Sequence, residues 1–234
     1  MKDIFITSAV RTAVGSLGKS LKNISADVLG SAVITDAVNK SKIKNNEVDE
    51  IILGQVLTGG TGQNPARQAA IKSGIPIEKP AYIVNQVCGS GLRSVASAFQ
   101  SIKSGDANII VAGGQENMSL APHALHLRDG KKLGDAKLID TMIKDGLWDA
   151  FNDYHMGITA ENVAEKFQIT RSEQDKFALN SQEKALNAQK ENKFNEEIID
   201  LKIESKKTQI DFSKDEHPRE GINLEALSRL KPVF

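Results

Sequence analysis

The only cysteine among the 234 residues occupies a position where a thiol could act as a nucleophile. Cys88 lies between an apolar, strand-like run at residues 81–84 and a helix-like run that begins near Leu92. At the start of a helix, free backbone N–H groups and the positive end of the helix dipole favour a thiolate over a thiol. Gly89 and Gly91 leave the backbone open for an acyl group to approach. The pattern predicts a nucleophile.

A buried core cysteine is the alternative, because a free cysteine behaves as a small apolar side chain. The flanking Gly-Ser-Gly sequence and the strand-to-helix position favour the nucleophile. A single cysteine cannot form an internal disulfide or a thiolate metal site, which suits a reducing compartment.

The composition excludes several function classes. Thirty basic and thirty acidic side chains cancel, so no field of one sign indicates nucleic acid or an anionic membrane as a partner. Aromatic residues make up only 5%, which argues against a base-stacking surface. The first six residues do not resemble a signal peptide, and no window approaches a membrane-spanning length. We expect a soluble, cytoplasmic protein.

Strands and helices are expected to alternate in the first half, which is typical of an α/β layer whose sheet is covered on both faces. Ser25 and Asn64 are expected to cap helices, and Gly105 to end one. The expected strands are residues 4–10, 49–54, 81–84 and 108–114, and the expected helices are residues 26–39, 65–72 and the stretch from the Cys88 turn to Ser104.

The chain becomes more polar after Gln115, which indicates a lid or an insertion. Thr170 and Glu173 form a capping box that predicts a helix to about Lys190. Residues 196–204 alternate as an edge strand or a short ribbon would. The predicted domains are residues 1–118, a first domain that carries the cysteine, and residues 119–234, the lid.

Three other motifs are weaker. The glycines of residues 59–65 precede a helix, but they lack the ending of a nucleotide-binding loop and favour a structural turn. His155 beside Met156 indicates either a structural histidine or the wall of a ligand pocket. Arg219 is either a phosphate contact or a solvated side chain. The histidines show no metal-ligand spacing, so no metal is expected.

Four motifs in order resemble those of the thiolase family, and the resemblance extends from Ile4 to Phe234. The motifs are residues 62–69 (GQNPARQA), 85–93 (NQVCGSGLR), 112–119 (AGGQENMS) and 154–162 (YHMGITAEN). Residues 87–91 and 154–156 are most similar to the biosynthetic acetyl-CoA acetyltransferases, whereas thiolases that degrade long acyl chains usually differ there. The resemblance implies a layered α/β/α thiolase domain, here incomplete, with an inserted lid.

The resemblance also implies roles for individual residues. Cys88 matches the nucleophile that carries an acetyl group as a thioester while two acetyl-CoA and acetoacetyl-CoA plus CoA interconvert. The positions that match CoA and acyl contacts are Leu147, His155, Met156, Arg219 and Phe234. Coenzyme A thioesters would be substrates and no cofactor would be needed. Family members are typically homo-tetramers.

Thiolases continue after the position that matches Phe234 into a second α/β domain. That part carries the family's catalytic histidine, an asparagine that holds a water molecule and a second cysteine, and none of these has a matching position here. The chain is therefore expected to be truncated, inactive alone and dependent on a separate C-terminal part.

Two alternatives to this interpretation remain. A non-catalytic remnant would bind CoA or another thiolase subunit. A condensing enzyme similar to ketoacyl synthases would share the chemistry of a cysteine at a helix, but residues 154–162 argue against it.

Overall fold

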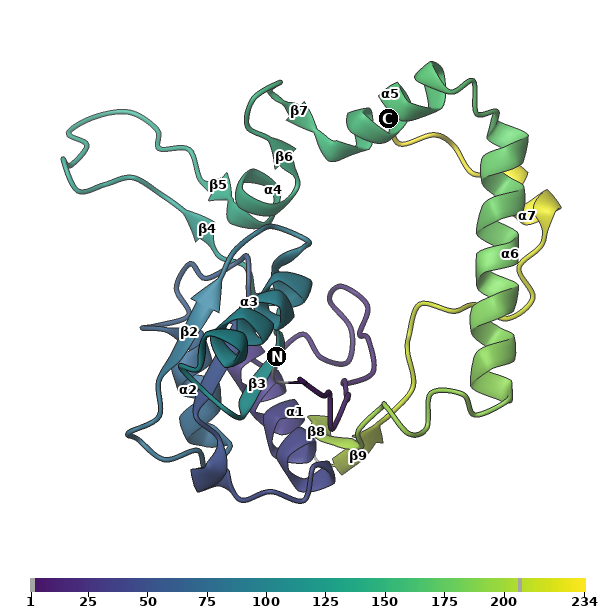
Figure 1. Ribbon diagram of the computed structural model, residues 1–234. Coiled ribbons are helices and arrows are strands. Elements are labelled where there is room, and N and C mark those ends of the chain that lie inside the picture. The colour runs from purple at the N-terminus through teal and green to yellow at the C-terminus, as the bar shows by residue number, and fades with distance from the viewer. Residues whose placement is uncertain (1–2, 206–207) are drawn as a thin grey trace.

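A three-stranded parallel sheet forms the centre of the first half of the chain (Figure 1). The computed structural model describes residues 3–205 and 208–234. The strand order is β2-β1-β3, with β1 at Glu50–Gly54, β2 at Ala81–Val84 and β3 at Ile110–Gly114. Residues 51–53 of β1 are at most 1% exposed, because helices cover the sheet on both faces. The expected α/β layering is confirmed.

Helices α1 (Ala26–Lys40) and α2 (Pro65–Lys72) pack together on one face, and α3 (Ser90–Ser104) lies on the other (Figure 1). The Asn64 side chain caps α2 by accepting the Arg67 N–H at 3.1 Å, as predicted. The capping hydrogen bond predicted for the Ser25 side chain is wrong. Helix α1 does begin after Ser25, but that side chain makes no capping hydrogen bond.

The main core lies between the sheet and helices α1 and α2. Its members are apolar side chains from the two helices, the strands and the connecting segments, namely Ile34, Val38, Val48, Ile51, Leu53, Ala66, Ala69, Ala70, Ile75 and Ala81. Small alanines on α2 let that helix approach α1 closely. This core holds the end of β1, where the Cys88 turn is seated.

The strand predicted at residues 4–10 is wrong. The segment contains no strand, and Phe5 and Ile6 are each 79% exposed. Only Arg11 forms an isolated parallel bridge, to Ile198. A short apolar run becomes a strand only when a neighbouring edge supplies hydrogen bonds, and this segment has no such neighbour within the described residues.

The second half forms an arch that leaves the sheet near α3 and returns beside α1 (Figure 1). The helix predicted from Thr170 is confirmed as α6, and the predicted ribbon near residues 196–204 is part of a hairpin, β8 with β9. Besides the sheet and helices α1 to α3, the described chain contains η1 (Asn45–Glu47), η2 (Met118–Leu120), β4 (His123–Ala124), β5 (Ile139–Asp140), α4 (Thr141–Gly146), β6 (Trp148–Asp149), β7 (Tyr154–His155), α5 (Met156–Lys166), α6 (Arg171–Lys190), β8 (Leu201–Ser205), β9 (Thr208–Phe212) and α7 (Leu224–Ser228).

Arg11 fastens the returning end of the arch to the first half. Its guanidinium donates to Asp215 in bidentate fashion at 2.8 and 3.0 Å, donates to Glu197 at 2.6 Å and lies 5.2 Å from the ring centre of Phe194. Burial of Asp215 opposes its ionisation, but the bonds from Arg11 and from the Val14 N–H outweigh burial and hold the pKa of Asp215 below its usual range. A small apolar cluster that includes Leu21, Leu201, Ile203 and Phe212 surrounds the same junction.

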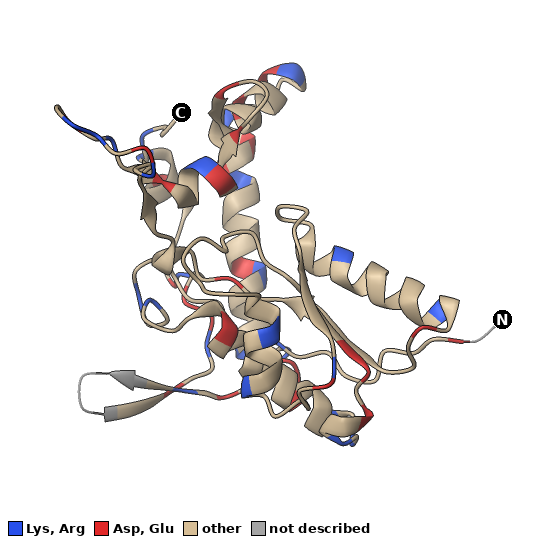
Figure 2. Ribbon diagram, turned by 90° about the vertical axis from the view of Figure 1, so that its left-hand side faces the viewer, with Lys and Arg blue, Asp and Glu red and all other residues tan. Residues whose placement is uncertain are grey.

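The outer face of α3 is apolar and uncovered in the described structure. Leu92 is 77% exposed and Phe99 is 51% exposed. Positions of Lys and Arg and positions of Asp and Glu are interspersed along the described ribbon (Figure 2). Among the described residues, no helix has the length and apolarity needed to cross a membrane.

Replacing Asp215→Asn tests the Arg11 junction. We expect the free energy of unfolding near neutral pH to fall by about 2 kcal/mol, because hydrogen bonds between charged groups are lost. A lowered carboxyl pKa stabilises the fold above the unfolded value, and this contribution disappears as pH falls through the folded value. The difference between wild type and variant should therefore shrink below about pH 4. Urea unfolding across pH measures both effects, and Asp211→Asn, an exposed carboxylate on β9, is the control.

The uncovered face of α3 predicts self-association at micromolar concentration, because exposed apolar surface of this extent favours contact between copies. Replacing both Leu92→Glu and Phe99→Glu should lower the associated mass in light scattering. Leu133→Glu, which changes a 90% exposed leucine in a distant loop, should not. A stable wild-type monomer under these conditions contradicts the prediction.

Candidate functional site

The Cys88 turn is held by hydrogen bonds whose donors and acceptors belong to the neighbouring residues and not to the cysteine itself. The buried Ser90 hydroxyl accepts the Gln86 N–H at 2.8 Å and donates to the Val87 carbonyl at 2.6 Å. The Asn85 side chain accepts the Val87 N–H at 3.0 Å. Cys88 is exposed at the tip, directly before the helix-capping residue Gly89. The predicted strand-to-helix position of the thiol is confirmed.

Val87 adopts a left-handed backbone conformation, with φ of 49°. A β-branched residue in this region is strained by about 1–3 kcal/mol, and such strain persists only where neighbouring bonds overdetermine the geometry. Here the bonds from Asn85 and Ser90 provide that constraint. The turn therefore presents the thiol in one fixed direction.

Glycine residues let the first turn of α3 sit directly on the sheet. A Cβ atom at Gly54, the last residue of β1, would lie only 2.4 Å from the carbonyl carbon of Ser90. One turn further along α3, the fully buried Ser94 hydroxyl lies 2.7 Å from the carbonyl oxygen of Gly113 in β3. The position of Cys88 is thus fixed by the ends of two strands.

Four of the five predicted CoA contacts gather at the start of α5. The His155 ring stacks on the Phe234 ring with centroids 4.7 Å apart. The Met156 N–H donates to the Leu147 carbonyl at 2.9 Å. Gly157 makes room for the stack, because a Cβ there would lie 2.2 Å from the Phe234 ring. The structure brings these contacts together from three separate segments.

The imidazole of His155 serves as the cap of α5. Its Nδ1 accepts the Gly157 N–H at 3.0 Å, which leaves Nε2 as the atom that carries the proton of a neutral ring. The stack on Phe234 and this bond fix the ring orientation. The structural and functional interpretations of this histidine are therefore compatible.

The β6–β7 ribbon sets the position of His155 opposite Trp148. At its tip, Asp149 accepts a hydrogen bond from the Asn152 side chain and from the backbone N–H groups of Asn152 and Phe151. These donors hold the pKa of Asp149 below its usual range, with the Asn152 side chain the largest cause. The ribbon therefore keeps an ionised, well-bonded tip at neutral pH.

Arg219 lies apart from the other four predicted contacts. Its backbone N–H donates to the Gln182 side chain of α6 at 2.8 Å, and its side chain is exposed. The hydrogen bonds and ring contacts of the described residues join neither Arg219 nor Cys88 to the cluster around His155. The part of the chain described here thus holds the thiol and the predicted CoA contacts as separate groups.

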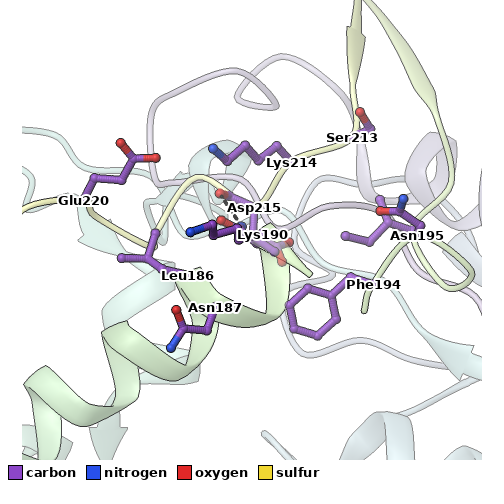
Figure 3. Close-up of a pocket in the computed structure, with 11 residues that line it drawn as sticks. Leu186, Asn187, Lys190, Phe194, Asn195, Ser213, Lys214, Asp215 and Glu220 are labelled. Atoms are coloured by element: carbon purple, nitrogen blue, oxygen red, sulfur yellow. Dashed lines mark hydrogen bonds between the residues drawn. The ribbon is translucent and has the colours of Figure 1, made fainter. Parts of the chain in front are cut away.

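A cavity of 540 Å³ lies at the C-terminal end of α6, beside the Arg11 junction (Figure 3). Lys190, Lys214, Asp215 and Glu220 place both signs of charge in its walls. The residues that line the cavity lie between Leu186 and Glu220 and include none of the residues around His155. The cavity therefore belongs to the junction and not to the predicted CoA site.

Comparison with known proteins assigns the family. The model of the thiolase N-terminal domain matches residues 4–234. The chain belongs to the thiolase family. An acetyl-CoA acetyltransferase of Cupriavidus necator is 56% identical over the whole chain, and a cytosolic acetyl-CoA acetyltransferase of the rat is 50% identical over 99% of it.

The family fold is also confirmed in three dimensions. The crystal structure of the Bacillus anthracis acetyl-CoA acetyltransferase superposes with a TM-score of 0.94 at 39% identity, over 98% of this chain. This thiolase-family chain spans 60% of the length of the Cupriavidus necator relative and 58% of the Bacillus anthracis chain. The resemblance found in the four motifs is therefore correct.

The sequence alone missed the residues that hold the Cys88 turn. Ser90 and the strained Val87 looked like ordinary neighbours of the cysteine. Glycines at the ends of two expected strands, Gly54 and Gly113, were a usable signal, because glycine in a strand often marks a close backbone approach.

Replacing Ser90→Ala should slow alkylation of Cys88 by iodoacetamide. Wild-type Cys88 should react faster than free cysteine near neutral pH, since a helix N-terminus stabilises negative charge. Loss of the Ser90 hydroxyl frees the turn, and we expect roughly a two- to fivefold slower reaction.

The matched control is Ser104→Ala, which removes a hydroxyl from the opposite end of the same helix, far from the turn. It should leave the alkylation rate unchanged. Equal slowing in both variants contradicts a specific role for Ser90, and a wild-type rate no faster than free cysteine contradicts activation of Cys88.

Proposed function

We propose that this chain supplies the acyl-accepting half of an acetyl-CoA acetyltransferase, with Cys88 as the nucleophile. The observation that carries the proposal is the fixed, exposed thiol at the N-terminus of α3 in a chain of the thiolase family. The thiolate sulfur would attack an acetyl carbonyl and form a thioester on Cys88, while the CoA thiolate leaves and takes a proton. In condensation, a second acetyl-CoA loses a proton from its methyl carbon, that carbon takes the acetyl group to give acetoacetyl-CoA, and Cys88 leaves as a thiolate. In thiolysis, Cys88 instead attacks the 3-keto carbonyl of acetoacetyl-CoA, acetyl-CoA leaves after taking up a proton, and free CoA then removes the acetyl group from Cys88.

The lid, residues 119–234, would hold the CoA part of the substrate. The exposed apolar side chains of Met156 and Phe234, 42% and 49% exposed, suit the long uncharged arm of CoA. Leu147 lies at the same place through its bond to Met156. Arg219 is exposed and able to meet a phosphate group, since guanidinium binds phosphate in bidentate fashion.

Catalysis needs more groups than the described residues provide at the turn. Deprotonation of the second acetyl-CoA requires a general base, and the lid histidine is bonded to the backbone instead. We propose that the region of the relatives beyond the part matched here supplies these groups. A homo-oligomer of the assembled protein is part of the same proposal. So is a place in the cytoplasm, which is supported by the word cytosolic in the names of the rat and mouse relatives.

A complementation assay tests the proposed function. The chain alone should show no thiolysis of acetoacetyl-CoA, and adding the remaining part of the Cupriavidus necator relative should restore it. Cys88→Ala and Cys88→Ser should both abolish the restored activity, because a serine alkoxide is far harder to form than a thiolate. Ser31→Ala, a change on the far helix α1, is the control that should retain it.

Turnover by the isolated chain contradicts the proposed division of the catalytic groups. Restored activity in Cys88→Ala contradicts the nucleophile. Binding of CoA without any restored activity favours the non-catalytic remnant instead.

A further inference from the structure

Residues 55–59, the segment that follows β1, are neither helix nor strand, yet side chains from other parts of the fold hold them. The Glu116 carboxylate, just beyond β3, accepts the N–H groups of Val56 at 2.8 Å and of Leu57 at 3.3 Å. A carboxylate that accepts two successive backbone N–H groups forms charge-assisted hydrogen bonds, which are stronger than those between neutral groups. Glu116 therefore fixes the first part of this segment.

A pair of buried glutamines holds the other polar group of the Leu57 backbone. The Gln55 side chain donates to the Leu57 carbonyl at 3.0 Å and accepts from the Gln115 side chain at 2.8 Å. Both glutamines are at most 6% exposed. Since both the N–H and the carbonyl of Leu57 are bonded, its side chain leaves the backbone in a defined direction.

The segment begins where the Cys88 turn rests on the sheet. Gln55 directly follows Gly54, whose missing Cβ lets the first turn of α3 approach β1. The Gln55 N–H donates at 3.2 Å to the carbonyl of Val84, the last residue of β2 before the turn. The segment and the proposed nucleophile are therefore anchored to the same strand ends.

The lid rests on the same segment at both ends of α4. A Cβ atom at Gly146, the last residue of α4, would lie 3.7 Å from the Leu57 side chain. A Cβ at Gly59 would lie 3.6 Å from the Pro122 ring, and the Pro122 carbonyl accepts the N–H of Thr141, the first residue of α4, at 3.3 Å. The place of α4 thus depends on where residues 57–59 are held.

Helix α4 leads directly into the cluster of predicted CoA contacts. Leu147 follows Gly146, and its carbonyl accepts the Met156 N–H at 2.9 Å. The next residue, Trp148, pairs with His155 in the β6–β7 ribbon. A displacement of α4 would therefore move the whole cluster relative to the sheet.

We propose that Glu116 is a positioning residue for the reaction, which sets the distance between the Cys88 thiol and the predicted CoA contacts by holding the segment on which the lid rests. The inference rests on the proposed function, since it requires one CoA thioester to reach both groups. Glu116 acts through Leu57 and is not itself a reacting group. A misplacement of about 1 Å between reacting groups can lower a rate by about 100-fold.

Asp49 offers a matched comparison at the opposite end of the sheet, directly before β1. Its carboxylate accepts the N–H groups of Asn108 at 2.8 Å and of Ile109 at 3.1 Å, the same kind of contact that Glu116 makes. A role of Glu116 in stability alone predicts that Asp49→Ala and Glu116→Ala behave alike. A positioning role predicts that only Glu116→Ala disturbs the lid.

Fluorescence energy transfer tests the inference with the chain's own residues. Cys88 is the only cysteine and Trp148 the only tryptophan, and the Trp148 indole is fixed by its bond to Asp153 at 2.9 Å. An aminonaphthalene sulfonate attached to the thiol through an iodoacetamide serves as the acceptor, and the decay of tryptophan emission gives the distribution of distances. Glu116→Ala should widen this distribution about twofold, because the segment under the lid is freed. Asp49→Ala should leave the width unchanged.

Two further variants keep the test valid if Glu116→Ala does not fold. Glu116→Gln retains one acceptor oxygen and should give an intermediate width. Leu57→Ala removes the side chain through which Glu116 acts and should widen the distribution as Glu116→Ala does.

Two rates separate positioning of the lid from damage to the nucleophile. Alkylation of Cys88 by iodoacetamide should be as fast in Glu116→Ala as in wild type, because Asn85 and Ser90 still hold the turn. In the complementation assay, the same variant should lower kcat/KM for acetoacetyl-CoA at least about tenfold.

An unchanged distance distribution in the folded Glu116 variants overturns the inference, and so does equal widening in Asp49→Ala. Slower alkylation of Cys88 in Glu116→Ala overturns it because the residue would then hold the turn, and widening without a lower kcat/KM overturns it as well. If the wild-type assay restores no thiolysis, the proposed function fails by itself, since the distance measurement does not require turnover.

Discussion

The close seating of α3 on the ends of β1 and β3 is the constraint on which the rest of the site depends. Gly54 has no room for a Cβ against the first turn of α3, and Ser94 bonds to the carbonyl of Gly113 in the neighbouring strand. The sheet is itself fixed by a core that is almost fully buried around Ile51 and Leu53. Because α3 packs against this well-buried sheet, the exposed thiol of Cys88 at the start of α3 has a defined position.

The strain at Val87 fits this arrangement. A left-handed valine would relax in an isolated peptide, and it persists here because the strand before it and the helix after it are both anchored. The hydroxyl of Ser90 belongs to the anchored helix and bonds to the two residues before Cys88. A nucleophile on such a turn needs little reorganisation when an acyl group arrives, which is the advantage of a preorganised site.

The two halves of the chain depend on each other through few contacts. Arg11 joins the first segment to Asp215 and Glu197, and a small apolar cluster with the β8–β9 hairpin supports the same place. Between its two ends, the arch from η2 to β8 makes few contacts with the sheet. The exposed apolar residues on α3, and the edge of β3 that no strand of the described residues pairs with, show where the fold has capacity for further contacts.

Local patterns in the sequence predicted most elements of the first half. The Asn64 cap, the stop at Gly105 and the capping box at Thr170 all depend on neighbours within a few residues, and all three are present. The strand expected at residues 4–10 failed because strand formation requires a partner elsewhere in the chain. The stack of His155 on Phe234 was likewise beyond local patterns, since it joins residues far apart in sequence. The resemblance to thiolases named both residues, but only the structure shows that Gly157 makes their contact possible.

Mass spectrometry of the assembled protein after brief exposure to acetyl-CoA tests the central claim most directly. The account predicts one acetyl group on the peptide that contains Cys88, removable by neutral hydroxylamine as a thioester is, and none in Cys88→Ala. An acetyl group on another residue, or turnover without any acetylated Cys88, contradicts the account.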